Sequence, residues 1–399
     1  MEADLIPLVA GILIFLASLI SLRLGLSVAI IEIMLGVVAG NYIGLQPEPW
    51  MTYLAGFGGI LLTFLAGAEV DVELMREKFK ESMLIGSASF LLPFVGALLY
   101  CYFVAGWTMN ASLIAGVALS TTSLAVVYSV LVETGLTKTE LGKLIMATTF
   151  VTDIGTALAL SILFIKPSLY TGVFVVVSVL VIWLATKFSH LIFHNPKLKG
   201  KVIEPEIKYL FVLLLAFIYF AALGDSHAVL PAFVLGLAMS KHFTESPETL
   251  AVRNRLRTVA YALITPFFFI IGGMKVSIPM VAAAFGLFAV LFFVKQITKF
   301  VGVYFLAKKY LPKGEMYTTL LMSTGLTFGT ISSVFGYQAG YIDQVQFSVL
   351  IAVVIASAVI PTFVAQKWFR PVHSEDILET NGTKDNLNER REARKGEQK

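Results

Sequence analysis

The sequence predicts an all-α membrane protein that crosses the bilayer many times. Hydrophobic residues make up 57% of the 399 residues and charged residues only 14%, whereas soluble domains carry about 25% charged residues. The mean hydropathy is +0.83. Apolar stretches of about 20 residues, the length that a helix needs to span a bilayer, follow one another along the chain.

We predict about thirteen transmembrane helices. The first apolar run follows Glu2 and Asp4 rather than a basic segment, which favours a true first helix over a signal peptide. The short span at 228–241 and the long one at 279–308 suggest that one is broken and the other tilted. The predicted spans are approximately 5–22, 26–43, 51–68, 82–105, 110–132, 141–165, 170–193, 207–223, 228–241, 257–275, 279–308, 315–338 and 344–367.

Positive charges are distributed unequally between the two sets of loops. The poorer set holds little beyond Lys166 and Lys275. Because cytoplasmic loops carry the excess of lysine and arginine, we expect an external N-terminus and a cytoplasmic C-terminus in the cell membrane. The polar, charged tail at 368–399 is predicted to be disordered. The richer set comprises Arg23, Arg76, Lys78, Lys80, Lys138, Lys143, Lys187, Lys197, Lys199, Lys201, Lys241, Arg253, Arg255, Arg257, Lys308, Lys309 and Lys313.

Internal similarity predicts two inverted repeats of six helices, at about 5–165 and 207–367, joined by a linker helix at about 170–193. Three pairs of spans resemble each other in the same order, seven helices apart, which places the two halves in opposite orientation. The paired segments are 64–71 with 270–277, 119–123 with 322–327, and Leu144-Ile145 with Leu350-Ile351.

One aspartate lies in the middle of an apolar span. Asp153 falls in the run from about Lys143 to Lys166, where four threonines are its polar company. A charge at the bilayer centre costs at least about 2.5–3.5 kcal/mol, and residues that carry one usually face a cavity or a pathway. Asp153 is therefore the first candidate for ion binding; the alternative is a carboxyl that is protonated or paired for structural reasons.

Two polar runs occupy corresponding positions in the repeats. Glycine and hydroxyl residues weaken a helix, so these runs predict discontinuous helices that cross beside Asp153, with freed carbonyls able to coordinate a small cation. The alternative is that small residues merely allow close helix packing. The runs contain Ser120, Thr121, Thr122 and Ser123 in the fifth helix, and Thr324, Gly325, Thr327 and Gly329 in the twelfth.

Four more charged residues lie in or beside apolar spans. Lys299 is about 13 Å from the cytoplasmic helix end at 1.5 Å per residue, so it either extends to the surface or lies near Asp153. Lys295, one turn deeper, is the competing candidate for that place. Glu32 is a possible pathway residue or a structural carboxyl, and Glu69 belongs to a cluster at a helix end that suggests a cytoplasmic funnel.

No other chemistry is indicated. The single cysteine, Cys101, excludes an internal disulfide, and the five histidines form no i,i+4 pair. The sequence contains no phosphate-binding glycine loop and no G-x-S-x-G motif. It therefore predicts neither an enzyme nor a nucleotide-driven pump, with no cofactor and no nucleic-acid partner.

Taken together, these residues resemble the monovalent cation/proton antiporters of the cation–proton antiporter superfamily, nearer to the NapA-type and Kef-type branch. The resemblance covers about residues 5–367. It depends on the segments 31–33 with Gly36 and Gly40, 64–69, 119–126, 152–153, 232–236, 268–274 and 299–302.

The resemblance implies an NhaA-like fold in a homodimer, with elevator-type alternating access. It implies that Asp153 binds H⁺ in competition with Na⁺ or K⁺, with Lys299 beside it. Hydroxyl groups of Thr152, Ser123 and Thr122 would supply further oxygen ligands, as hard alkali cations require.

The chain departs from the family pattern at several points. Members of the family commonly have Asp, Asn or Gln immediately before the ion-binding aspartate, whereas this chain has Thr152 before Asp153. A second aspartate, associated in the family with electrogenic exchange, is absent, which favours electroneutral exchange, although Lys299 leaves electrogenic exchange open. The tail after Trp368 is too short for a Kef-type regulatory domain. The alternatives are a K⁺/H⁺ antiporter, a sodium-coupled organic anion symporter of similar fold, and a membrane sensor.

Overall fold

The computed structural model describes residues 5–24, 27–136, 139–164, 169–189, 204–223, 228–311 and 313–371. All regular secondary structure in these ranges is helical, and π-helical turns (η) extend three of the helices. The first half contains α1 (Leu5–Leu24), α2 (Val28–Val38), η1 (Ala39–Ile43), α3 (Pro49–Ala68), α4 (Val72–Glu77), α5 (Phe79–Leu99), η2 (Tyr100–Val104), α6 (Met109–Ser120), α7 (Leu124–Glu133), α8 (Glu140–Leu163) and α9 (Leu169–Phe188).

The second half continues with α11 (Pro205–Leu223), α12 (Val229–Thr244), α13 (Pro247–Val259), η3 (Ala260–Ile264), α14 (Thr265–Met274), α15 (Ile278–Ala283), α16 (Phe285–Tyr310), α17 (Glu315–Met322), α18 (Thr327–Gln338) and α19 (Gln344–Trp368). The predicted disordered tail from residue 372 onward, and the linker helix beyond residue 189, lie outside the described residues.

Each of the thirteen predicted spans corresponds to one helix or to consecutive helices in the described ranges. Nine helical segments there are long and apolar enough to cross a membrane, and three apolar helices are shorter. The spans predicted at 110–132 and 315–338 are divided near their middle, into α6 and α7 and into α17 and α18. The long span at 279–308 is divided at Ala284, which separates α15 from α16. The predicted all-α polytopic fold is confirmed.

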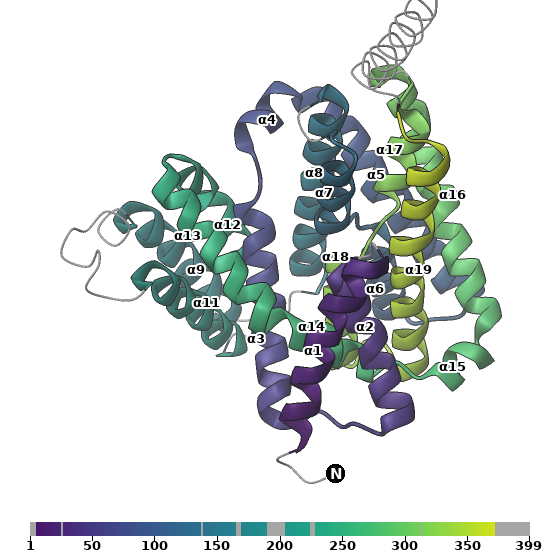
Figure 1. Cartoon of the computed structure of the whole chain (residues 1–399), viewed down its shortest axis with the longest axis horizontal. Coiled ribbons are helices and arrows are strands. Elements are labelled where there is room, and N and C mark those ends of the chain that lie inside the picture. Colours follow the sequence, from purple (N-terminus) through teal and green to yellow (C-terminus); the bar gives the residue numbers. More distant parts are fainter. Residues whose placement is uncertain are drawn as a thin grey trace, which may run out of the picture.

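Figure 1 shows two groups of helices side by side. The peripheral bundle, on the left, contains α3, α9, α11, α12 and α13; the broken-helix bundle, on the right, contains α5 to α8 and α16 to α19. Each bundle has its own cluster of buried apolar side chains. Helices α1, α2 and α14 lie between them, and a third, larger cluster joins the two bundles.

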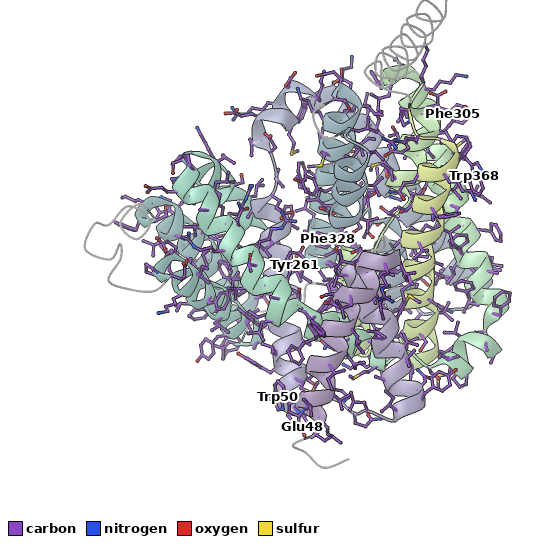
Figure 2. The ribbon with its side chains drawn as sticks, viewed as in Figure 1. Glu48, Trp50, Tyr261, Phe305, Phe328 and Trp368 are labelled. Carbon is purple, nitrogen blue, oxygen red and sulfur yellow. The ribbon has the colours of Figure 1, made fainter. Side chains whose placement is uncertain are left out.

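The two ends of the molecule are marked by α4 and by Trp50. α4 follows the C-terminal end of α3, whereas Glu48 and Trp50 lie together at its beginning, at the opposite end (Figure 2). The Trp50 indole donates a hydrogen bond to Glu48 Oε2 at 2.8 Å. We call these the α4 end and the Trp50 end.

Glycines bring two pairs of helices into backbone contact in the same way. A Cβ atom on any of these four glycines would overlap a backbone carbonyl group of the partner helix. In each case that carbonyl belongs to the residue three positions before the glycine of the partner helix. This relation joins α2 to α14 in one pair and α12 to α3 in the other. The four contacts are Gly36 to Ile270, Gly273 to Ile33, Gly236 to Phe64 and Gly67 to Phe233. The predicted repeat equates the third span (α3) with the tenth (α14), and the second (α2) with the ninth (α12). Such a repeat requires that the contact between α2 and α14 recur as a contact between α12 and α3.

Candidate ion-binding site

The first helix break lies in the middle of the broken-helix bundle. α6 ends at Ser120, and Thr121 is extended, with φ −68° and ψ 158°. The hydroxyl groups turn back onto α6: Ser120 Oγ donates to the Val117 carbonyl at 2.9 Å and Thr121 Oγ1 to the Ala118 carbonyl at 3.3 Å. Such side-chain bonds compete with the helical pattern, so the chain leaves the helix here and resumes it at Leu124.

The second break crosses the first and is hydrogen-bonded to it. The Ser123 amide donates to the Thr324 carbonyl at 2.8 Å, and Thr122 Oγ1 donates to the Met322 carbonyl at 2.9 Å. The hydroxyl oxygens of Ser123 and Thr327 are 3.5 Å apart. The predicted crossing of discontinuous helices is therefore present, with both runs in direct contact.

Several carbonyl groups at the breaks already accept hydrogen bonds. Thr324 Oγ1 donates to the Leu321 carbonyl at 2.7 Å, in addition to the bonds to Val117, Ala118 and Met322 described above. The sequence predicted carbonyls free to coordinate a cation. Hydroxyl groups of the same runs occupy these four instead, because buried carbonyls are seldom left without a donor.

Asp153 lies beside the crossing, on α8. Its side chain is 2% exposed, and in the described part of the chain its Oδ1 has no hydrogen-bond partner. It adjoins a small cavity of about 20 Å³, and a cavity needs roughly 10–15 Å³ to hold one water molecule. The other residues that line this cavity are Leu62, Ala66, Glu69, Leu124, Tyr261, Thr327 and Phe328.

Helix N-termini face the same small cavity. Leu124 is the first residue of α7 and Thr327 the first of α18, and both line the cavity with Asp153. The N-terminus of a helix carries a partial positive charge and unpaired amide groups, which favour an anion nearby. The two helix N-termini therefore offset part of the cost of burying an ionised carboxylate at this position.

Both intramembrane lysines are fully buried, so neither extends to the membrane surface. Lys299 Nζ donates to Ser89 Oγ at 2.9 Å and to Thr122 Oγ1 at 3.1 Å, which attaches it to the first break. Lys295 Nζ donates to Ser357 Oγ at 2.9 Å and lies against Gly325 in the second break. Of the two lysines, Lys299 is the one that acts electrostatically on Asp153.

The predicted hydroxyl ligands are not all directed at the cavity. Thr327 lines it, and Ser123 faces Thr327. Thr152 Oγ1 instead donates to the Thr149 carbonyl at 2.7 Å, within its own helix. Thr122 Oγ1 contacts Lys299 and the Met322 carbonyl.

Two lining aromatic residues were missed from the sequence. Tyr261 and Phe328 both line the small cavity, and Figure 2 shows them near the middle of the molecule. The sequence marks these two positions only weakly. Tyr261 follows Arg257 by one helical turn, and Phe328 lies inside the second polar run. Aromatic residues are too common in apolar helices for either position to have been singled out.

Two larger cavities toward the α4 end share residues with the small one. A cavity of about 550 Å³ between α3, α7 and α13 is lined by Glu69 and Leu124, which also line the Asp153 cavity. Burial raises the pKa of the Glu69 carboxyl, and the charges of Arg257 and Arg253 oppose that rise. A second cavity, of about 520 Å³, is lined by Glu32 and shares Leu62, Tyr261 and Thr327 with the Asp153 cavity.

A cavity toward the Trp50 end is separate from Asp153. It has a volume of about 550 Å³, and its lining includes Tyr53, Phe268, Lys275 and Gln338. It has no lining residue in common with the small cavity at Asp153. Of the three larger cavities lined by described residues, the two that share residues with the Asp153 cavity therefore lie toward the α4 end.

Known proteins are similar to the chain over most of its length. The family model described as "Sodium/hydrogen exchanger, transmembrane" matches residues 11–369. The probable Na(+)/H(+) antiporter 3 of Methanocaldococcus jannaschii is 29% identical over 361 residues, which cover 86% of this chain and 90% of that protein. The Na(+)/H(+) antiporter of Enterococcus hirae is 26% identical over 388 residues, covering 90% of this chain and 96% of that protein.

A solved structure has the same fold. The sodium proton antiporter MjNhaP1 from Methanocaldococcus jannaschii, at pH 8, matches with a TM-score of 0.70, covering 93% of this chain and 100% of that chain. The sequences are 14% identical, so this similarity concerns the fold alone.

Proposed function

Because the chain belongs to the sodium/hydrogen exchanger family, we propose that it exchanges Na⁺, or another alkali cation, for H⁺ across the cell membrane by competition at Asp153. The observation that carries this proposal is the buried carboxyl with an unpartnered Oδ1 at a cavity of about 20 Å³. A carboxyl oxygen without a donor in such a site is available to a proton or to a cation. The cavity admits one particle the size of a water molecule.

Competition at one carboxyl couples the two fluxes. The ionised carboxylate attracts a dehydrated alkali cation, and the protonated acid does not. The oxygen ligands that such a cation needs are available nearby from Thr327 and Ser123, and from Thr122 and Thr152 if their hydroxyl groups rotate. The N-termini of α7 and α18 stabilise the ionised form while the site is empty.

Alternating access completes the proposed cycle. The cavities beside Asp153 lie toward the α4 end, which the loop charges predict to be cytoplasmic. A movement of the broken-helix bundle against the peripheral bundle would carry Asp153 to the other side, in the elevator manner. We further propose that two chains form a homodimer, that the repeats 5–165 and 207–367 together form the transmembrane antiporter domain, and that one cation is exchanged for one proton.

The size of the site disfavours the organic-anion alternative. Sites for organic ligands have volumes of about 300–1,000 Å³ and polar groups that orient the ligand. The cavity at Asp153 has about 20 Å³ and is lined by two carboxylates, Asp153 and Glu69. A cavity of this volume is too small for an organic anion.

The proposal is tested by flux in proteoliposomes with an internal pH-sensitive dye. Adding Na⁺, Li⁺ or K⁺ outside should release protons from inside for at least one cation, with saturation at a single class of sites. One-for-one exchange should not respond to an imposed membrane potential. Failure of all three cations to move protons would refute exchange, and a rate that follows the potential would refute the proposed stoichiometry.

The two lysines should differ in their effect on exchange. Lys299→Ala removes the ammonium that bonds to Thr122 and acts on Asp153, so we expect a shifted pH profile of exchange and lower stability. Lys295→Ala removes a charge attached to Ser357 and should shift the profile less. Proton flux measured between pH 6 and 9, with thermal unfolding of both variants, checks this; equal shifts would show that Lys299 has no special relation to Asp153.

A further inference from the structure

Arg257 lies where the two bundles meet, and it lines both of the larger cavities that share residues with the Asp153 cavity. Its Nε is 3.3 Å from Glu69 Oε1, and its guanidinium carbon is 6.0 Å from the centre of the Tyr128 ring and 5.9 Å from that of Tyr261. These residues come from four different elements: α13, the end of α3, α7 and η3. One side chain thus contacts both the peripheral and the broken-helix bundle.

The cavities meet at this side chain. Arg257 lines both the cavity of about 550 Å³ and the cavity of about 520 Å³, and it is the residue that their linings share. Glu69, its ion-pair partner, lines the larger of the two and also the small cavity at Asp153. A cation that moves from the larger cavity to Asp153 therefore passes the Glu69–Arg257 pair.

The larger cavity does not attract cations by an excess of negative charge. Its lining contains four acidic and four basic side chains, which are Glu69, Asp71, Glu73 and Glu245, and Arg76, Lys241, Arg253 and Arg257. Of these acids, Glu69 is the one that also reaches the Asp153 cavity. Whatever neutralises Glu69 therefore decides how strongly this entrance holds a cation.

We propose that Arg257 is a tethered cation on Glu69, so that an alkali cation entering from the larger cavity must displace its guanidinium before it reaches Asp153. The inference rests on the proposed exchange at Asp153 and adds a step before it. The guanidinium stays charged at every physiological pH, so the competition does not depend on its own titration. Both partners are partly exposed, and an ion pair of this kind is weak enough to be displaced.

Removing the tethered charge should make the entrance bind cations more tightly. We expect Arg257→Gln to lower the apparent KM for Na⁺ by about threefold to fivefold, the range that a partly exposed ion pair supports. Arg257→Lys keeps a positive charge and should stay closer to the wild-type KM. Na⁺-dependent proton flux in proteoliposomes measures KM, and the Na⁺ concentration for half-maximal thermal stabilisation gives an independent readout.

The matched control is Arg255→Gln. Arg255 lies on the same helix and pairs with Glu204 at 2.8 Å, but it lines none of the cavities described above. Its loss should leave the KM unchanged. Combining Arg257→Gln with Glu69→Gln should remove most of the gain in affinity, because the carboxylate that the arginine covers is then absent.

The inference is overturned if Arg257→Gln leaves KM unchanged or raises it, if Arg255→Gln lowers KM equally, or if the gain persists without the Glu69 charge. Where Arg257→Gln does not fold, Arg257→Met, which retains an unbranched apolar stem, takes its place. Failure of the proposed function looks different: the wild-type protein then shows no exchange, or Asp153→Asn still shows it.

Discussion

Asparagine at position 153 is expected to reduce cation–proton exchange to the background rate of empty liposomes. The amide has nearly the shape of the carboxyl but can neither take up a proton near neutral pH nor offer a negative charge to Na⁺. Asp153 is 2% exposed and adjoins the small cavity between the two breaks, and Glu69, the other carboxyl that lines this cavity, is paired with Arg257. The protein should remain folded, because removing a buried charge also removes its desolvation cost.

Thr156→Val is the control for Asp153→Asn. Thr156 is fully buried one turn further along α8 and donates to the Thr152 carbonyl at 2.8 Å. Its isosteric replacement should leave exchange largely intact. Size-exclusion profiles and Na⁺-dependent thermal stabilisation accompany the flux measurement, and Asp153→Asn should lose the stabilisation as well. Exchange by Asp153→Asn above background would remove Asp153 from the centre of the mechanism.

The sequence predicted the features that depend on a local pattern of residues. Apolar runs locate the spans, and hydroxyl and glycine runs at Ser120–Ser123 and Thr324–Gly329 locate the breaks. A carboxyl and two ammonium groups inside apolar spans stand out because lipid disfavours them. Each of these signals needs only the local sequence and the chemistry of the bilayer.

The features that it could not predict depend on packing between distant segments. Lys295 and Lys299 are one turn apart, and both have apolar neighbours in the sequence. Only the contacts of Lys295 with Ser357, and of Lys299 with Ser89 and Thr122, show that the two lysines belong to different breaks. Arg257 is one of many basic residues near helix ends, and its contact with Glu69 joins positions 188 residues apart. Nothing in either local sequence distinguishes that pair.

The glycine at the second break should be nearly irreplaceable. A Cβ atom on Gly325 would overlap Lys295 Nζ and would lie 2.7 Å from Thr121 Oγ1 and 2.8 Å from the Thr121 carbonyl oxygen. Gly325→Ala must therefore push the two breaks apart at their crossing. Overpacking of this kind costs about 1–3 kcal/mol. Because about 1.4 kcal/mol corresponds to a tenfold change in rate, the accompanying shift at Thr121 should lower the maximal rate of exchange by about tenfold or more.

Gly272→Ala separates this effect from the general cost of altering a buried glycine. A Cβ atom at Gly272 has its nearest neighbours, Thr330 Cγ2 and Val334 Cγ2, at 3.8 Å, which is ordinary contact. Exchange rate and thermal unfolding of this variant should stay near wild type. Adding Lys295→Ala to Gly325→Ala removes one of the colliding groups and should restore part of the stability, since the Thr121 carbonyl still obstructs the methyl group. If the two glycine variants behaved alike, the crossing would not be as tightly packed as the contacts at Gly325 require.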